Sequence, residues 1–463
     1  MRGDRAHLLD SLAGARPRSF WLDTPDRPAA LPALQDDLDT DLLVVGGGYC
    51  GLWTALQAKE QDPDRDVVLL EGRTTGWAAS GRNGGFLEAS LTHGPDNGQR
   101  HFPTELDVLE RLAQRNFDAL TATLDRYGID AELEDAGELV VATTAEQERA
   151  LRAAAGPHAR FLDSRALTAY VDSPLLRAGL LQTRGVALVN PAKLVWGLRR
   201  ACLRLGVRIF EHTSVTGLAD PGTHVVAHTG EGVVRARRVA VATNGFPSLL
   251  RRTRSLTLPV YDYVLMTEPL TPDQLAAVGW TGRHGITDCS RQFHYYRKTA
   301  DDRVLWGGYD VVYHRGGGVD PAHDRSEETF LRLADHFFAT FPRLAGTRFT
   351  HAWGGMIDMS SRLVAHHGVA MGGKVAHSAG FTGLGLAATR FAGTVMLDLL
   401  AGRDTELTRL SVVTRRPLPI PPEPLRFPAV QVMRRAIARS DRNGGRDGLL
   451  IKVADRIGFS FDS

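Results

Sequence analysis

The sequence predicts an α/β fold in which a Rossmann-type domain is joined to a second, α+β domain built on a mixed or antiparallel sheet. The first observation is a glycine motif, Gly46-x-Gly48-x-x-Gly51, that follows an apolar strand and opens a helix. The second is a strand-like, aromatic stretch at 251–344, as expected of a second sheet. The third is the length of 463 residues, which is enough for about two domains.

The glycine motif lies inside a predicted β-α-β unit. Residues 41–45 and 66–71 are apolar runs typical of buried strands. Between them, 46–51 is a glycine-rich turn and 52–60 has helical character. A unit of about 30 residues in this order has the size of a mononucleotide-binding half.

The middle of the chain alternates between helical and strand patterns. Apolar spacing and stop signals predict four further helices, three further strands and a late strand–turn–helix. The helices are expected at 103–124, 146–155, 191–205 and 327–341, the strands at 137–142, 207–210 and 238–243, and the strand–turn–helix at 377–401.

The two ends of the chain have a different character. Residues 1–37 show no clear periodicity, and we expect an extended arm over the surface. From 406 the chain is Pro-rich, and a basic helix is expected at 429–438. We expect this helix to pack on the protein with its arginines in water; the alternative is an anionic membrane surface.

These patterns divide the chain into a nucleotide-binding domain interrupted by two excursions that build a second domain. The predicted parts are an arm at 1–37, the nucleotide domain at 38–95, 185–250 and 345–405, the second domain at 96–184 and 251–344, and a tail at 406–463.

Composition excludes several classes of protein. The net charge of +2 offers no global attraction for nucleic acid. The three cysteines, Cys50, Cys202 and Cys289, are far apart and form no CxxC, so neither a disulfide framework nor a metal site is expected. The apolar runs are too short for a membrane span, and the first residues lack a secretory signal. We therefore expect a cytoplasmic protein.

Three glycine-rich segments carry the chemistry. In the first, the glycines let the backbone approach a pyrophosphate at a helix N-terminus. Glu71, at the end of the next strand, is placed to accept hydrogen bonds from ribose hydroxyls. The second, 76–85, is rich in small residues that let the backbone lie against a flat ligand. Its polar side chains, Ser80, Arg82 and Asn83, could contact phosphate or ring heteroatoms of that ligand. The third, 380–385, opens a helix whose dipole could face a flavin.

The order of these segments resembles the D-amino-acid oxidase and sarcosine oxidase superfamily of FAD-dependent oxidoreductases. The shared text includes the glycine motif, GWAASGRNGGF, VATNGF (241–246), Trp353-Gly354-Gly355 and GFTGLG. The likeness is greatest to gamma-glutamylputrescine oxidase-like proteins, which share GGGYxGLWTA and SGRNGG. The resemblance implies FAD at the junction of a flavin domain and a substrate domain, and we expect it to be bound without a covalent link.

The resemblance and the motifs together define an expected FAD site. Its residues are Gly46, Gly48, Tyr49, Cys50, Gly51, Glu71, Gly72, Arg73, Ser80, Gly81, Arg82, Asn83, Gly84, Gly85, Val215, Thr243, Asn244, Gly245, Trp353, Gly380, Phe381, Thr382, Gly383, Leu384 and Gly385.

The substrate wall is expected among aromatic residues of the second domain. Tyr261, Tyr263, Phe293, His294, Tyr295 and Tyr296 lie on predicted strands, and alternation aims half of them inward. The pocket-lining candidates are Tyr263, His294, Tyr296, Trp306 and Trp353. Arg297 and Lys298 could bind a distal anion, although a solvated strand end is the expectation. No catalytic acid or base is assigned, because the flavin carries the chemistry.

Departures from sarcosine oxidases refine the expected reaction. Those enzymes bind a carboxylate through a Lys after the last glycine turn, where this chain has Leu-Ala-Ala at 386–388. Trp306 occupies the place of their oxygen-activating Lys, and His351 and Ala352 lie where they have the Cys that links flavin covalently.

The resemblance implies hydride removal from a C–H beside an amine nitrogen, followed by hydrolysis of the imine. We expect a primary or secondary amine as substrate and oxygen as acceptor. The alternatives are a D-amino-acid or N-methyl-amino-acid dehydrogenase or demethylase, a flavin monooxygenase, and a non-catalytic flavin-binding subunit.

Overall fold

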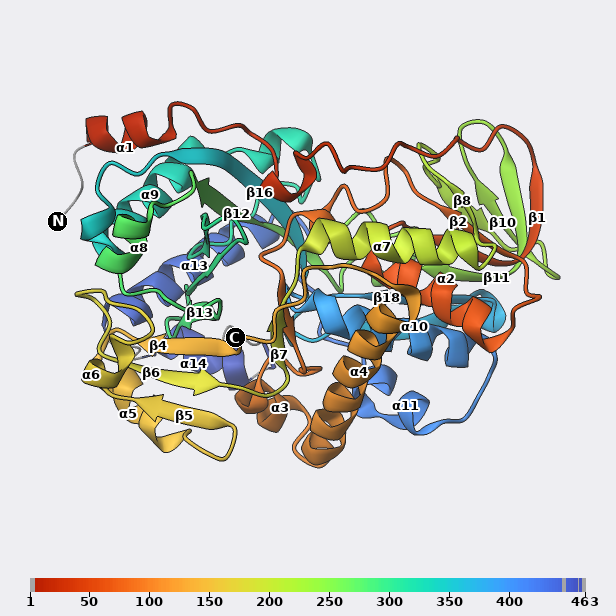
Figure 1. Ribbon diagram of the computed structural model, residues 1–463. Coiled ribbons are helices and arrows are strands. Elements are labelled where there is room, and N and C mark those ends of the chain that lie inside the picture. Colours follow the sequence, from red (N-terminus) through yellow and green to blue (C-terminus); the bar gives the residue numbers. More distant parts are fainter. Residues whose placement is uncertain (1–4, 444–446, 457, 460–463) are drawn as a thin grey trace.

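The computed structural model describes residues 5–443, 447–456 and 458–459 and contains two large sheets. In Figure 1 these sheets occupy opposite halves of the molecule, with β1, β2, β10 and β11 on one side and β4, β5, β6 and β12 on the other. The parts of the predicted arm and tail at 1–4, 444–446, 457 and 460–463 lie outside the described residues.

The first sheet has a parallel centre, as a Rossmann-type domain requires. Strand β1 (Leu38–Val45) pairs in parallel with β2 (Val67–Leu70) on one side and β11 (Val233–Val241) on the other. The remaining strands are β8 (Arg208–Phe210), β9 (Gly217–Ala219), β10 (Val225–His228), β17 (His366–Ala370) and β18 (Val375–Ala379). The predicted β-α-β unit is confirmed, since α2 (Tyr49–Gln61) connects β1 to β2.

The second sheet is mixed, as predicted. Its pairs are antiparallel except for β13 (Gly285–Asp288) with β4 (Glu138–Ala142), which run in parallel. The other strands are β5 (Ala159–Leu162), β6 (Ala178–Gln182), β12 (Leu258–Thr267), β14 (His294–Lys298), β15 (Val304–Gly308) and β16 (Phe349–Met359). The predicted boundary at 345 assigns β16 to the nucleotide domain, but β16 pairs along its length with β12.

Helices cover both sheets. α2, α7 (Pro191–Arg204) and α10 (Gly385–Leu400) pack together beside the first sheet, whereas α9 (Glu327–Thr340) packs on the second. The others are α3 (Pro95–His101), α4 (Leu106–Tyr127), α5 (Ala145–Ala153), α6 (Ser164–Leu167), α8 (Pro272–Ala277), α11 (Glu406–Arg409), α12 (Ser411–Thr414), α13 (Arg426–Arg442) and α14 (Leu449–Arg456). A small ribbon of β3 (Phe86–Glu88) and β7 (Val186–Leu188) lies apart from the large sheets.

The predicted extended arm is wrong for its first part. Residues 5–12 form α1 (Arg5–Leu12), because Leu8 packs into the same apolar cluster as Phe337 of α9. The arm then follows the surface as expected, and Trp21 donates a hydrogen bond from Nε1 to the carbonyl of Asn83 over 3.0 Å. None of the described helices has both the length and the apolar character that a membrane crossing needs.

Candidate functional site

A cavity of about 330 Å³ lies between the two sheets and joins the glycine-rich segments to the second sheet. Its size is that of a small-molecule site. We call one end the glycine end, lined by Tyr49, Ser80, Asn83, Gly385 and Leu386. We call the other the sheet end, lined by Val260, Asp262, Thr287, Tyr295 and Ile357.

Backbone strain is concentrated around this cavity. In the part of the chain that the structure describes, nine non-glycine residues have a positive φ, and five of them line the cavity. Each such conformation costs on the order of 1–3 kcal/mol and tends to persist where function requires it. The five are His93, Asn244, Tyr309, Leu363 and Thr382.

The N-terminus of α2 is built by close packing of the glycine motif. Gly46 adopts a φ of +113°, and a Cβ at Gly51 would lie 1.9 Å from the Gly46 carbonyl oxygen. No side chain caps this helix at Gly48, while the N–H of Tyr49 donates to Ser80 Oγ over 3.0 Å. The remaining N–H groups of the first turn are therefore available to an anion.

Glu71 holds the glycine loop from the end of β2. Its carboxylate accepts hydrogen bonds from the N–H of Gly47 over 2.7 Å, the N–H of Arg73 over 2.9 Å and Nε1 of Trp77 over 2.9 Å. Burial raises the pKa of Glu71, and these hydrogen bonds oppose that shift. A carboxylate accepts about four hydrogen bonds, so three of its acceptor positions are already used within the protein.

The N-terminus of α10 is the second helix end at the cavity. Its N-cap, Leu384, makes no side-chain cap, and the turn before it is held by Asp358. Asp358 accepts from the N–H of Gly380 over 2.6 Å and of Phe381 over 3.1 Å. Burial raises the pKa of Asp358 to about 6. Two uncapped helix N-termini facing one cavity suit the phosphates and the anionic reduced ring of FAD.

About half of the predicted FAD residues line the cavity. Those that do are Tyr49, Ser80, Arg82, Asn83, Gly84, Gly85, Asn244, Phe381, Thr382, Gly383, Leu384 and Gly385. Those that do not are Gly46, Gly48, Cys50, Gly51, Glu71, Gly72, Arg73, Gly81, Val215, Thr243, Gly245, Trp353 and Gly380. Most of the second group shape the backbone behind the lining, and Val215 packs in the apolar cluster of Val45 and Leu70.

None of the pocket-lining candidates of the second domain lines the cavity, and four of them, Tyr263, His294, Tyr296 and Trp306, occupy the opposite face of the sheet. Tyr263, Tyr296, Trp306 and Trp353 are each at most 1% exposed and, like His294, lie outside the cavity lining. Tyr296 and Trp306 pack beneath α9 with Phe341, and His294 interacts with His336 of that helix over 3.0 Å.

Trp353 lies at the junction of the two halves rather than on a ligand. Its Nε1 donates to the Arg82 carbonyl over 2.9 Å, and its ring belongs to the apolar cluster that includes Leu42. Trp353 pairs with Val264, so it lies on the cavity face of the sheet but beyond the lining. The residues that face the cavity beside Tyr263, His294 and Tyr296 are their sequence neighbours Asp262, Val264, Phe293 and Tyr295.

Two acids of the sheet end lack a cationic partner. Asp262 accepts a hydrogen bond from the Tyr295 hydroxyl over 2.5 Å, and burial raises the pKa of Asp262 to about 6. Burial and the neighbouring Glu138 raise the pKa of Glu88. Neither Asp262 nor Glu88 forms an ion pair within the described ranges. At neutral pH Asp262 is ionised and can attract a cation, whereas a pKa raised to about 8 keeps Glu88 mostly protonated. Sequence reasoning singled out neither acid.

Each arginine of the cavity is already paired with an acid. The pairs are Arg82–Asp324, Arg291–Asp447 at 2.7 Å and Arg434–Asp310 at 2.5 Å. The cavity therefore offers paired cations and unpaired acids, which disfavours a carboxylate ligand and favours an amine.

Arg297 and Lys298 do not form the solvated strand end that the sequence predicts. They are 2% and 3% exposed, and neither lines the cavity. Arg297 Nη1 donates to the Val189 carbonyl over 2.7 Å, and Lys298 Nζ donates to the Trp280 carbonyl over 2.8 Å. Both long side chains run through the interior and end on backbone carbonyls, so they are structural.

His351, which lies where sarcosine oxidases have the Cys that links flavin covalently, also lies away from the cavity. His351 Nε2 contacts Asp23 Oδ2 over 3.2 Å, and its Nδ1 contacts Thr350 Oγ1 over 3.0 Å. Cys50 is a buried free thiol on the core side of α2. The cavity lining contains no lysine among the described residues.

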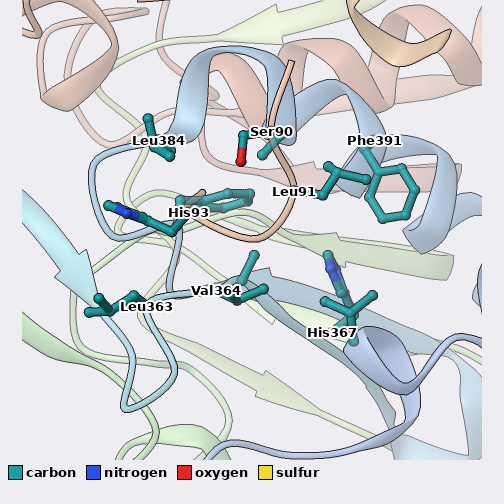
Figure 2. Close-up of a pocket in the computed structure, with 12 residues that line it drawn as sticks. Ser90, Leu91, His93, Leu363, Val364, His367, Leu384 and Phe391 are labelled. Atoms are coloured by element: carbon teal, nitrogen blue, oxygen red, sulfur yellow. The ribbon is translucent and has the colours of Figure 1, made fainter. Parts of the chain in front are cut away.

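A small apolar pocket of about 20 Å³ adjoins the cavity and shares His93, Leu363 and Leu384 with it. Figure 2 shows His93 on one side of this pocket and Phe391 on the other. His93 Nε2 interacts with the Thr382 carbonyl over 2.8 Å, and burial lowers the pKa of His93. The volume is that of about one water molecule, so this pocket cannot hold a substrate.

The chain resembles known proteins over most of its length. The model of the family described as FAD dependent oxidoreductase matches residues 41–399. The chain is 29% identical over 416 residues to the gamma-glutamylputrescine oxidoreductase of Escherichia coli, covering 87% of this chain and 93% of that protein. It is 27% identical to the sarcosine oxidase subunit beta of Rhizobium meliloti, covering 69% of this chain and 74% of that protein.

Solved structures share the fold. Glycine oxidase from Geobacillus kaustophilus superposes with a TM-score of 0.66 at 19% identity, covering 80% of this chain and 96% of that one.

Proposed function

The chain belongs to the FAD dependent oxidoreductase family, and on this premise we propose that it oxidises a primary or secondary amine at the sheet end of the cavity. The product imine hydrolyses to an aldehyde and an amine or ammonia, and oxygen is the proposed final acceptor. The E. coli and Rhizobium relatives, named for gamma-glutamylputrescine and sarcosine, support an amine substrate.

The observation that carries the proposal is the charge arrangement of the sheet end. Asp262 and Glu88 have no cationic partner, while Arg82, Arg291 and Arg434 are each paired with an aspartate. An amino acid would bring a carboxylate into the cavity, but every arginine in the described lining is already paired with an aspartate. A simple amine presents only an ammonium group, which the ionised carboxylate of Asp262 attracts.

The amine must lose its proton before it reacts, because a protonated nitrogen cannot stabilise a developing iminium ion. The sheet end combines the acids with the apolar side chains of Phe293, Ile357 and Met359. Desolvation against these side chains lowers the pKa of a bound amine and thus favours its free base. Asp262, held by Tyr295, is placed to keep the amine nitrogen oriented.

We propose that FAD occupies the glycine end, held by the segments at 46–51, 71–73, 80–85 and 380–385, and that it is bound without a covalent link. When bound, it supplies the acceptor for the hydride. Support comes from the two uncapped helix N-termini and from the partners that already engage His351. Acid precipitation should release free FAD, and flavin that stays with the pellet would contradict this.

The test of the proposed function is anaerobic mixing of the holoprotein with separate substrate classes while the flavin absorbance is followed. The panel contains alkylamines, polyamines, gamma-glutamyl amines, N-methyl amino acids and D-amino acids. Bleaching by amines that lack an α-carboxylate supports the proposal, and admitting air then separates an oxidase from a dehydrogenase.

Three other results would overturn the proposed function. Bleaching by amino acids alone would favour the dehydrogenase or demethylase alternative. Bleaching by NADPH alone would favour a monooxygenase. No bleaching by any compound would favour a flavin-binding subunit.

A further inference from the structure

Helix α13 reaches the cavity from outside the family match. The match ends at residue 399, whereas α13 spans Arg426–Arg442. Two of its side chains, Arg434 and Ile437, line the cavity. Figure 1 shows α13 on the same side of the molecule as β12 and β13, away from the parallel sheet. The cavity therefore has a wall that the family-matching part of the chain does not supply.

Arg434 fixes the middle of α13 to the second sheet. Its Nη2 and Nε donate to both carboxylate oxygens of Asp310, over 2.5 Å and 3.1 Å. Arg332 of α9 donates to the same carboxylate over 3.0 Å. The Asp310 side chain is 7% exposed, so this two-pronged contact is shielded from water and orients the helix strongly.

Both ends of α13 are also anchored beside the cavity. At its C-terminal end, Asp441 accepts from the N–H groups of Arg291 and Gln292 over 3.1 Å and 3.0 Å. At its N-terminal end, Phe427 and Val430 pack on the cluster that contains Val260. Since Arg291, Gln292 and Val260 are lining residues, each anchor attaches α13 directly to the cavity wall.

We propose that α13 is the outer wall of the amine-binding cavity, and that Ile437, positioned by the Arg434–Asp310 ion pair, determines how large an amine the cavity admits. This inference rests on the proposed function for the identity of the ligand. Because Asp310 neutralises Arg434, the wall presents an apolar side chain and no free charge. The amine should therefore end in an apolar group where it meets Ile437, and the steric limit should act on alkyl length.

The experiment compares two aliphatic positions of the same helix in the full-length holoprotein. Ile437→Ala and Ile437→Trp change the cavity wall, whereas Val432→Ala and Val432→Trp make the same changes at a residue that is 50% exposed and outside the lining. Anaerobic flavin reduction is measured with n-alkylamines of increasing length. A change of one methylene in an apolar pocket alters selectivity by roughly 10–200-fold.

We expect Ile437→Trp to lower the rate of flavin reduction by the longest accepted amine by about tenfold or more, while the rate with the shortest amine changes little. Ile437→Ala should allow longer amines to reduce the flavin. Arg434→Met should shift the length preference in the direction of Ile437→Ala. Equal effects on all lengths, or the same shift in the Val432 variants, would overturn the inference.

A second readout separates this inference from the proposed function. Iodide quenching of flavin fluorescence reports access to the cavity without any amine. Ile437→Ala and Arg434→Met should raise the quenching constant, and the Val432 variants should leave it unchanged. If the wild type oxidises no amine, the proposed function fails, and unchanged quenching in both wall variants would then overturn the inference as well.

Discussion

The protonation of single buried acids decides how the cavity behaves with pH. Asp262 faces the sheet end and is held by the Tyr295 hydroxyl. Burial raises the pKa of Asp262 from 3.8 to about 6, against the opposing effect of its hydrogen bonds. At neutral pH the carboxylate is ionised, and below about pH 6 it is protonated and loses its attraction for an ammonium group.

This shift predicts how Asp262→Asn changes stability with pH. The folded state binds more protons than the unfolded chain between about pH 4 and pH 6, so the contribution of Asp262 to the free energy of unfolding falls as pH rises through that window. The free energy of unfolding of the variant, relative to that of the wild type, should increase from about pH 4 to pH 6 and then stay constant. Urea unfolding across this range measures it.

Asp301→Asn is the matched control for that experiment. Burial would raise the pKa of Asp301, but hydrogen bonds from Thr299 and Arg303 outweigh burial and lower it. The stabilisation that ionised Asp301 contributes is lost only as pH falls through its lowered pKa. The difference in free energy of unfolding between Asp301→Asn and the wild type should therefore not change with pH above about pH 4. An Asp262→Asn difference that is equally flat would contradict the assignment.

Glu71 connects the glycine loop to the cofactor, and Glu71→Ala should weaken FAD binding about tenfold or more. The variant leaves the N–H groups of Gly47 and Arg73 and the Trp77 indole without their acceptor, and each unpaired buried donor costs about 1–3 kcal/mol. Fluorescence titration of the apoprotein with FAD gives the dissociation constant.

Asp66→Ala, at the exposed start of the same strand, should bind FAD like the wild type. Full FAD retention by Glu71→Ala would remove the ribose and loop roles from this residue.

At the scale of an element, the start of α2 depends on a contact that tolerates no side chain. A Cβ at Gly51 would lie 1.9 Å from the Gly46 carbonyl oxygen, which is backbone and cannot rotate away. Gly51→Ala should therefore destabilise the protein by about 1–3 kcal/mol or more and reduce FAD content. Thermal unfolding and the flavin-to-protein absorbance ratio measure the two effects.

Gly217→Ala is the control, because a Cβ at Gly217 in β9 has no neighbour within 4 Å. Equal melting temperatures for the two variants would show that the packing of α2 on β1 is looser than the structure indicates.

Elements defined by local patterns could be predicted from the sequence, and the faces of strands could not. The glycine spacing identified β1, α2 and β2 because close packing requires glycine at those positions. Alternation showed that half of the aromatic residues point inward. It did not show which half, because the packing of α9 decides which face of β14 and β15 is covered. Tyr296 and Trp306 were therefore assigned to the wrong side.

The contribution of α13 could not be predicted for a different reason. Its charges and apolar residues indicate an amphipathic helix but contain no information about where it docks. That position depends on Asp310 and on the backbone of Arg291 and Gln292, which are remote in sequence. The expectation that its arginines lie in water holds for Arg435 and Arg439, which are exposed, and is wrong for Arg434.

At the scale of the whole molecule, the two sheets share one hydrophobic cluster. Leu42 and Val44 of β1 belong to it together with Val264 of β12 and Trp353 of β16. Neither sheet can expose its part of this cluster without uncovering the other. Arg82 adds a polar connection, because it pairs with Asp324 and donates to the Gly354 carbonyl over 3.2 Å.

This shared core predicts cooperative unfolding. Tryptophan fluorescence, flavin fluorescence and calorimetry should report one coincident transition, since loss of either half removes the packing of the other. The Arg82→Met variant should lower the melting temperature without dividing the transition. Two separate transitions, with flavin release preceding the loss of tryptophan signal in the second sheet, would show that the halves are independent domains.

The lining of the cavity runs from Tyr49 to Ile437, across almost the whole chain. During synthesis on the ribosome, the glycine loop emerges long before the helix that completes the wall opposite it. A nascent chain can form the β-α-β unit early, because that unit is local in sequence. It cannot complete the glycine end until residues 380–385 have been translated, and the amine-binding end stays open until α13 has docked. We therefore expect cofactor loading to come late in synthesis, and chains stalled before α13 should carry an open, exchangeable site.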